Sequence, residues 1–209
     1  MVIGFYGLSV ILTYIGLGFS IFGITLAIKG HIPAAIMCLI VSGICDMFDG
    51  FVARKCKRTE QEKKFGIQID SLVDMVSFGV FPVIIGLGMK FDSKICILIY
   101  MLYVLNAVIR LGYFNVMAEE KTILKKNKDK VKYYQGLPVT SIAIILPFAY
   151  NFKILMNNVV FCKAYPLVML ATAVLFILNI KIKKPTGVWL VIFSILAAIE
   201  IAIISTAII

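Results

Sequence analysis

The sequence is poor in the residues that water-soluble enzymes place on their surfaces and in their active sites. Charged residues make up 15% of the 209 residues, whereas about a quarter is usual in soluble domains. It has one histidine, His31, no C-x-x-C pair, no P-loop and no dinucleotide fingerprint. These gaps exclude the usual nucleotide-binding folds, and they argue against a cysteine-held metal or a Ser-His or Cys-His catalytic arrangement.

Long apolar runs dominate the chain instead. Hydrophobic residues make up 61% of the sequence and the mean hydropathy is +1.00. Asp, Glu, Lys and Arg are absent from 1–28, 32–45, 75–89, 95–109, 133–152, 164–180 and 185–199. A membrane-spanning helix needs about 20 mostly apolar residues. The sequence therefore predicts an all-α polytopic membrane protein, with residues 1–209 forming a single integral membrane domain.

About seven transmembrane helices are expected, although the segments around Pro147 and Pro166 admit another division. The predicted helices lie near 7–28, 32–54, 65–89, 94–117, 137–153, 159–180 and 186–208. We read the N-terminus as retained, because it lacks the basic region and cleavage site of a removable signal.

Basic residues separate between alternate loops of this arrangement. One side carries Arg54, Lys55, Lys57, Arg58, Lys63, Lys64, the lysines from Lys121 to Lys132, Lys181, Lys183 and Lys184, and the other carries Lys29, Lys90, Lys94, Lys153 and Lys163. The positive-inside rule makes the first side cytoplasmic, so the N-terminus is expected on the inner side of a cell membrane. The net charge of +10 is thus a topology signal, aided by anionic lipids, and nucleic acid is not expected as a partner.

Four of the eleven acidic residues fall in the second and third predicted helices. Asp46 and Asp49 are three residues apart, and Asp70 and Asp74 are four apart, so each pair shares one helical face. The two helices are antiparallel. At 1.5 Å per residue both pairs lie about 7–14 Å from the cytoplasmic helix ends.

Converging carboxylates in a low dielectric share protons or hold cations. A set with oxygen donors alone suits Mg²⁺, Mn²⁺ or Ca²⁺, and two such ions would clamp a diphosphate for phosphoryl transfer. A cation pathway or a proton relay is the alternative. Gly50, Ala53 and Gly66 favour a ligand, because small residues leave room beside the acids. Arg54 lies at the mouth, where a guanidinium can bind phosphate.

The segment from Asp46 to Asp74 resembles the signature of the CDP-alcohol phosphotransferases. It reads Asp46-x-x-Asp49-Gly50-x-x-Ala53-Arg54, then eleven residues, then Gly66-x-x-x-Asp70-x-x-x-Asp74. The gap of eleven is longer than is usual in the family. The resemblance implies a six-helix core, often dimeric, with a site open to the cytoplasm.

The resemblance also implies a role for each position of the motif. Asp46, Asp49, Asp70 and Asp74 would ligate two Mg²⁺ or Mn²⁺ ions, with Asp74 also acting as the catalytic base. The CDP moiety would be bound by Asp49, Gly50, Ala53, Arg54, Gly66 and Asp70.

A second resemblance concerns the acceptor. The runs Asp70–Val80, Arg110–Asn115 and Gly136–Pro138 are similar to bacterial and archaeal phosphatidylserine synthases of this superfamily. That branch usually has a second Arg where Tyr113 stands and a Pro where Thr140 stands. The similarity implies CDP-diacylglycerol and L-serine as substrates, with Arg110 and Asn115 near the acceptor. For Arg110, pairing with a motif aspartate is the alternative.

The sequence thus predicts a membrane transferase that moves a phosphatidyl group from CDP-diacylglycerol to serine and releases CMP. A homodimer is expected from the family resemblance. The alternatives are the same reaction with glycerol 3-phosphate, inositol or inositol phosphate as acceptor, and, more remotely, a cation transporter. Glu200 has no motif around it, and we expect it to be paired or protonated in helix packing.

Overall fold

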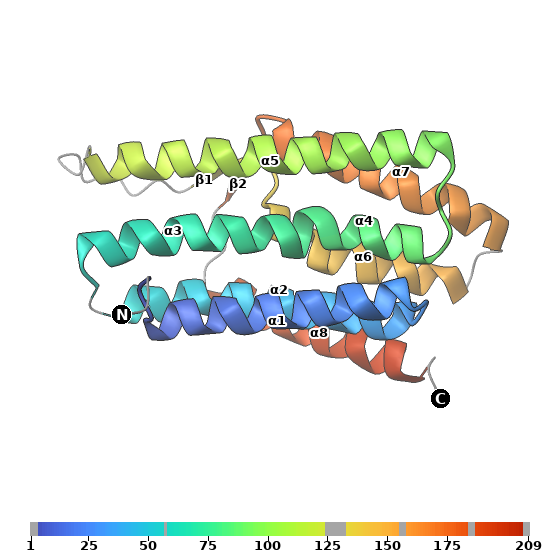
Figure 1. The fold of residues 1–209 in the computed structure, drawn as a ribbon, viewed down its shortest axis with the longest axis horizontal. Coiled ribbons are helices and arrows are strands. Elements are labelled where there is room, and N and C mark those ends of the chain that lie inside the picture. Colours follow the sequence, from blue (N-terminus) through green and yellow to red (C-terminus); the bar gives the residue numbers. More distant parts are fainter. Residues whose placement is uncertain (1–3, 57, 124–132, 155–157, 184–186, 207–209) are drawn as a thin grey trace.

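The computed structural model describes residues 4–56, 58–123, 133–154, 158–183 and 187–206. Its α-helices are α1 (Leu8–Ile28), α2 (Ile32–Lys55), α3 (Glu60–Asp74), α4 (Phe81–Gly88), α5 (Lys94–Ile123), α6 (Ile142–Asn151), α7 (Asn158–Ile177) and α8 (Gly187–Thr206). Three short helical turns are η1 (Met75–Val80), η2 (Val139–Ser141) and η3 (Phe152–Ile154), and two short strands are β1 (Tyr133–Gln135) and β2 (Lys181–Lys183). Figure 1 shows the helices lying along the long axis of the molecule.

The helices confirm the predicted all-α multi-pass membrane protein. Within the described residues, five helical stretches are long and apolar enough to cross a membrane, at Val10–Ile28, Ile32–Ala53, Glu60–Gly88, Lys94–Ala118 and Val160–Ile177. Two shorter apolar helical stretches, Val139–Asn151 and Ser194–Ile204, bring the helical segments to the expected seven. Pro147 and Pro166 lie inside α6 and α7 and do not divide them.

The predicted start of the third helix at residue 65 is wrong, because α3 begins at Glu60. Thr59 and Glu62 form a capping box, in which the Thr59 amide donates to Glu62 Oε2 at 2.7 Å and the Glu62 amide donates to Thr59 Oγ1 at 3.2 Å. Reciprocal caps of this kind satisfy two amides that a helix start leaves unpaired. Most of the expected polar loop Lys55–Lys64 is therefore helical.

The fourth predicted helix, near 94–117, also differs from its expected bounds. Helix α5 continues to Ile123, past the expected end at residue 117, so Lys121 belongs to the helix and not to the expected basic loop. Most of that loop's lysines, in residues 124–132, lie outside the described part of the chain.

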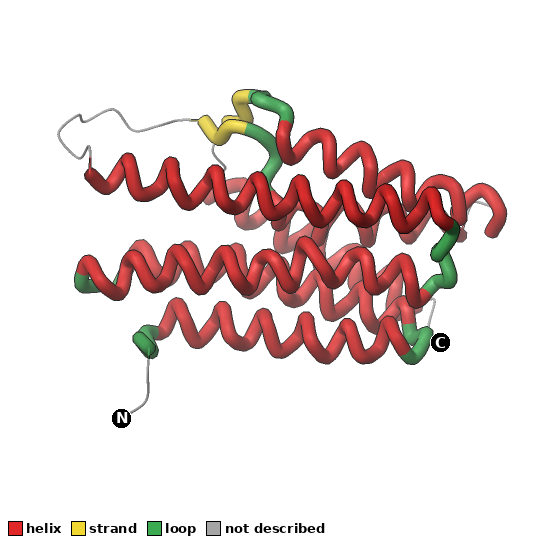
Figure 2. The backbone as a smooth tube through the Cα atoms, turned by 45° about the horizontal axis from the view of Figure 1, so that its top comes forward, coloured by secondary structure: helices red, strands yellow, loops and turns green. Residues whose placement is uncertain are grey.

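The helices pack around a core of aromatic and aliphatic side chains. Helix α1 packs against α2, α5 against α7, and α8 against α2 and α6; Figure 2 shows the same bundle turned by 45°. The largest fully buried side chains are Tyr103, Tyr165, Phe78, Phe81, Phe161, Phe176, Ile36, Leu39, Ile85, Ile142, Leu146 and Met169. These side chains come from α2, η1, α4, α5, α6 and α7, and Ala27 of α1 and Ala197 and Ile204 of α8 belong to the same core.

A π-helical turn, η1, follows directly after Asp74 and joins α3 to α4. Two buried tyrosines bond to carbonyl groups in this region: Tyr103 Oη donates to Phe78 O at 2.7 Å and Tyr165 Oη donates to Pro82 O at 2.6 Å. Inside a membrane every backbone carbonyl needs a partner, and a π-turn alters the regular pairing. Tyr103 thus stabilises the irregular turn beside the acidic residues, and Tyr165 stabilises the first turn of α4 that follows it.

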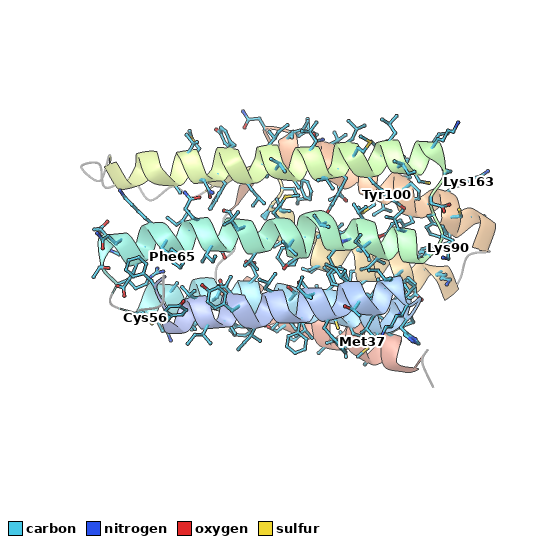
Figure 3. All side chains as sticks on the ribbon, in the orientation of Figure 1. Met37, Cys56, Phe65, Lys90, Tyr100 and Lys163 are labelled. Atoms are coloured by element: carbon cyan, nitrogen blue, oxygen red, sulfur yellow. The ribbon has the colours of Figure 1, made fainter. Side chains whose placement is uncertain are left out.

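The two ends of the bundle carry different connections. Figure 3 places Cys56 and Phe65, which flank the start of α3, at one end, and Lys90 and Lys163 at the other. Strands β1 and β2 pair antiparallel, with Tyr133 opposite Lys183, and tie the α5–α6 connection to the α7–α8 connection. The connections with more basic residues thus join the helices at one end of the bundle. This agrees with the alternation of basic and less basic loops in the sequence.

Candidate functional site

The acidic residues of α2 and α3 converge on one another. Carboxylate oxygens of Asp46, Asp49 and Asp70 all lie within 4.8 Å of one another. The carboxyl group of Asp74 makes a side-chain hydrogen bond with that of Asp46. The i, i+3 spacing on α2 and the i, i+4 spacing on α3 place each pair on the inner face of its helix. Antiparallel packing then sets the two pairs at the same depth.

Burial makes this cluster costly unless something compensates its charge. Asp49 is 6% exposed and Asp74 is 8% exposed, and Asp46 and Asp70 are half-buried. Carboxylates so close together repel one another strongly where water does not screen them. Protons or bound cations must therefore offset the negative charge.

Helix α1 reaches the cluster through Thr13. Its hydroxyl group donates a 2.5 Å hydrogen bond to Asp49 Oδ2, and Thr13 is itself buried. A donor on one carboxylate oxygen fixes the rotamer of the side chain and leaves the other oxygen for a ligand. Sequence reasoning missed Thr13, because it lies 36 residues before Asp49 in a helix that is apolar on most sides.

A small cavity of about 10 Å³, room for about one water-sized group, lies beside the carboxylates. Its walls come from α1, α2, α3 and η1 and consist of Thr13, Gly16, Ser42, Asp46, Asp49, Val73, Asp74, Ser77 and Phe78. Ser20 lies behind it and makes 2.8 Å hydrogen bonds with both Ser42 and Ser77. Ser42 precedes Asp46 by four residues and Ser77 follows Asp74 by three, and this helical spacing was a signal in the sequence that the prediction did not use.

The small residues of the motif lie on the side of the acids that is nearer the α2–α3 connection. Gly50, Ala53 and Gly66 are half-buried. A Cβ atom at Gly66 would lie 3.3 Å from Nη1 of Arg58, so this arginine covers Gly66. The backbone of Arg54 belongs to the last turn of α2, and its side chain lies outside the described part of the structure.

Arg110 on α5 is buried, at 7% exposure. Its Nε donates to the carbonyl oxygen of Leu137 at 3.2 Å. The preceding residue, Gly136, has φ +77°, and a Cβ there would lie 2.8 Å from the Phe176 carbonyl oxygen. A side chain at 136 would therefore clash, so the glycine keeps this turn tight against Arg110.

Asn115 links α5 to α3. Its Oδ1 accepts a 2.7 Å hydrogen bond from Ser71 Oγ, and its Nδ2 donates to Gln68 Oε1 at 3.4 Å. Ser71 adjoins Asp70, so this contact fixes α5 beside the acidic face of α3. A role for Asn115 in acceptor binding stays a prediction.

The donor set fits a hard divalent cation. Oxygen is the donor atom of every carboxylate in the cluster, and three of these groups meet within 4.8 Å. Mg²⁺, Mn²⁺ and Ca²⁺ prefer such ligands, whereas zinc and copper sites usually include histidine or cysteine.

Comparison with known proteins supports the same interpretation of the motif. The family model for CDP-alcohol phosphatidyltransferase matches residues 7–178, which run from α1 to α7 and leave out α8. A CDP-diacylglycerol–serine O-phosphatidyltransferase of Saccharomyces cerevisiae is 37% identical over 132 residues, covering 60% of this chain and 45% of the yeast protein.

Archaeal and bacterial relatives are also similar. An archaetidylserine synthase of Methanothermobacter thermautotrophicus is 29% identical over 184 residues, covering 88% of this chain and 72% of that protein. A CDP-diacylglycerol–serine O-phosphatidyltransferase of Helicobacter pylori is 32% identical over 111 residues, which are 52% of this chain and 42% of its own length. The chain therefore matches less than half the length of the yeast and Helicobacter proteins. The family match extends over six helical segments and includes the whole carboxylate cluster, and the chain belongs to the CDP-alcohol phosphatidyltransferase family.

Proposed function

We propose that the protein transfers the phosphatidyl group of CDP-diacylglycerol to the hydroxyl group of L-serine, forming phosphatidylserine and releasing CMP. The observation that carries this proposal is the convergence of Asp46, Asp49 and Asp70 within 4.8 Å in a chain of this family. The relatives share serine in their names and differ in the lipid named, which favours serine as the acceptor.

In this proposal Asp46, Asp49, Asp70 and Asp74 hold two divalent ions, Mg²⁺ or Mn²⁺. When bound, these ions would neutralise the diphosphate and stabilise the departing CMP. The Thr13 hydroxyl group, which donates to Asp49 Oδ2 at 2.5 Å, keeps one ligand in its binding rotamer. Asp49, Gly50, Ala53, Arg54, Gly66 and Asp70 bind the CDP moiety.

Asp74 acts as the general base. Its carboxylate takes the proton of the serine hydroxyl group as the serine oxygen bonds to the phosphorus atom next to diacylglycerol. The phosphoanhydride bond to CMP breaks in the same displacement, so one P–O bond forms and one breaks. Asp74 lines the cavity, where an acceptor hydroxyl group would meet it.

Arg110 binds the carboxylate of serine, and Asn115 helps to shape the acceptor pocket. A buried guanidinium group is well suited to a carboxylate, since it donates two parallel hydrogen bonds from a planar fork. The Nε bond to Leu137 O holds the side chain in position for this contact.

The site faces the cytoplasm, the N-terminus lies inside, and the enzyme works as a homodimer in a cell membrane. The segregation of basic residues supports the orientation, while the dimer rests on the family resemblance. Residues 1–209 form one integral membrane domain in this proposal.

An acceptor panel tests the proposed reaction. Purified protein with CDP-diacylglycerol and Mn²⁺ is offered L-serine, glycerol 3-phosphate, inositol and inositol phosphate, and the lipid products are identified by mass spectrometry. Phosphatidylserine is expected as the main product. Phosphatidylglycerol phosphate or a phosphoinositol lipid in its place would overturn the acceptor, and absence of CMP release with any acceptor would overturn the transfer itself.

A further inference from the structure

Arg58 lies in the short connection between α2, which ends at Lys55, and α3, which Thr59 caps. Its Nε is buried and has no hydrogen-bond partner among the residues that the structure describes. A buried donor without an acceptor is costly and rare in folded proteins. Arg58 is therefore held in a position where none of the described residues accepts a hydrogen bond from this donor.

The position of Arg58 relates it to the motif. Its Nη1 lies 3.3 Å from the place of a Cβ atom at Gly66. Gly66, Asp70 and Asp74 follow one another at intervals of four residues, so they share one face of α3. Arg58 thus lies over the acidic face, about one turn or 6 Å along the axis from Asp70.

The charged side chains that the structure describes near Arg58 have other partners. Glu62 is an acidic residue close enough to interact electrostatically with Arg58. Its carboxylate, however, accepts the capping bonds from the amide and hydroxyl groups of Thr59 at 2.7 and 2.9 Å. In the described part of the chain the ion pair of this region joins Lys63 to Glu60 at 2.8 Å. The guanidinium group of Arg58 is thus available to an anion beside Gly66.

We propose that Arg58 binds the phosphate oxygens of the CMP half of CDP-diacylglycerol, an inference that rests on the proposed function. The diacylglycerol part of the donor stays in the bilayer, so its CMP half points along α3 from Asp70 towards Gly66. Arginine matches phosphate with a planar fork of donors. Arg58 belongs to the longer stretch between Arg54 and Gly66, so this contact is a property of this chain beyond the family motif.

Binding of CMP in the presence of Mn²⁺ tests this contact without lipid. Titrations of wild type, Arg58→Ala and Arg58→Lys in detergent give the Kd. Loss of a charge-assisted hydrogen bond is expected to weaken CMP binding about tenfold or more in Arg58→Ala, with partial recovery in Arg58→Lys. In turnover assays the KM for CDP-diacylglycerol rises by a similar factor, and the KM for serine does not.

Two control variants separate this role from a structural one. Lys63→Ala removes a neighbouring charge from α3, and CMP binding should change less than twofold. Glu62→Gln weakens the cap and removes the negative charge near Arg58; it should lower the Tm without changing the Kd for CMP. If Glu62→Gln weakens CMP binding as much as Arg58→Ala does, Arg58 acts through the start of α3 and the proposal is overturned.

The outcomes also distinguish this inference from the proposed function. Wild-type protein that binds no CMP with Mn²⁺ and forms no lipid product contradicts the transferase itself. Wild-type protein that binds CMP and makes phosphatidylserine, beside an Arg58→Ala variant with the same Kd and KM, contradicts the role of Arg58 alone.

Discussion

In the part of the chain that the structure describes, buried carboxyl groups occur in two regions, and their surroundings differ. In α2 and α3 the carboxylates of Asp46, Asp49 and Asp70 converge within 4.8 Å beside a cavity. In α8 Glu200 is also buried, at 8% exposure, but it accepts a hydrogen bond from the Asn151 amide of α6. The aspartate cluster thus brings several negative charges together, whereas Glu200 is a single acid paired with a neutral donor.

The comparison teaches that burial of an acid in a membrane helix does not by itself indicate catalysis. Intramembrane acids are rare and usually functional, yet Glu200 has the partner that helix packing needs. The family match covers residues 7–178, so it includes the aspartate cluster and leaves out Glu200. Convergence of several carboxylates on a cavity is the more specific sign of a reaction site.

Removal of divalent metal should have the largest effect and should affect only the first region. Three carboxylates within 4.8 Å need cations to offset their repulsion. Chelation is expected to abolish turnover, and added Mn²⁺ or Mg²⁺ to restore it, as measured by CMP release. Full turnover in thoroughly metal-depleted protein would remove the metal from the proposal.

Asp74→Asn should leave a folded protein that still binds CMP but turns over poorly. An amide fills the same space beside Asp46 but cannot take the proton of the acceptor. We expect kcat to fall about 10²–10⁴-fold, measured with saturating substrates, and further if a metal is also displaced. Turnover near that of wild type would show that Asp74 is not the base.

Arg110→Lys should raise the KM for serine about tenfold or more, because the guanidinium fork is lost and an ammonium group does not replace it. The KM for CDP-diacylglycerol should stay nearly unchanged. Serinamide, which lacks the carboxylate, provides the control: wild type should prefer serine to serinamide strongly, and the variant should prefer it much less. An unchanged preference would remove Arg110 from the acceptor site.

Thr13→Val should weaken metal binding while leaving the aspartates in place. The hydroxyl group that donates to Asp49 Oδ2 at 2.5 Å is lost, and partners of metal ligands typically contribute about 10–100-fold to metal affinity or activity. The Mn²⁺ concentration for half-maximal turnover measures the effect. The matched control is Thr25→Val, since exposed Thr25 bonds only within its own helix, to Ile21 O at 3.0 Å.

Much of the fold and the approach of the aspartates could be predicted from the sequence. The apolar runs and the segregation of basic residues predict the membrane-spanning helices, because a bilayer requires long apolar segments. The spacing of Asp46 with Asp49 and of Asp70 with Asp74 predicts that each pair lies on one face of its helix. Because the two helices are antiparallel neighbours in the chain, these acidic faces were expected to meet. These are local rules, and each depends on residues close together in the chain.

Other features depend on packing that such rules do not contain. The rotation that brings Thr13 to Asp49 is set by the contact of α1 with α2, and an almost uniformly apolar α1 gives no periodic signal for it. The bonds from Tyr103 to the Phe78 carbonyl group of η1 and from Tyr165 to the Pro82 carbonyl group of α4 likewise join residues far apart in the chain. The early start of α3 was missed because the capping box at Thr59 precedes a charged turn instead of an apolar one.

Glu200→Gln should produce the smallest effect. Glutamine has nearly the same shape and keeps an oxygen that accepts the hydrogen bond from Asn151, which is the polar contact described for Glu200. We expect kcat and both KM values to stay within about twofold, and the free energy of unfolding to change by about 1 kcal/mol or less.

Glu200→Leu provides the contrast, because it leaves the Asn151 amide without this acceptor inside the bundle. An unpaired buried donor costs about 1–3 kcal/mol, so this variant should have a lower Tm while its remaining folded fraction turns over normally. Thermal unfolding and turnover per folded molecule separate the two effects. A strong loss of turnover in folded Glu200→Gln would place α8 in the reaction and would end the distinction between the two buried acidic regions.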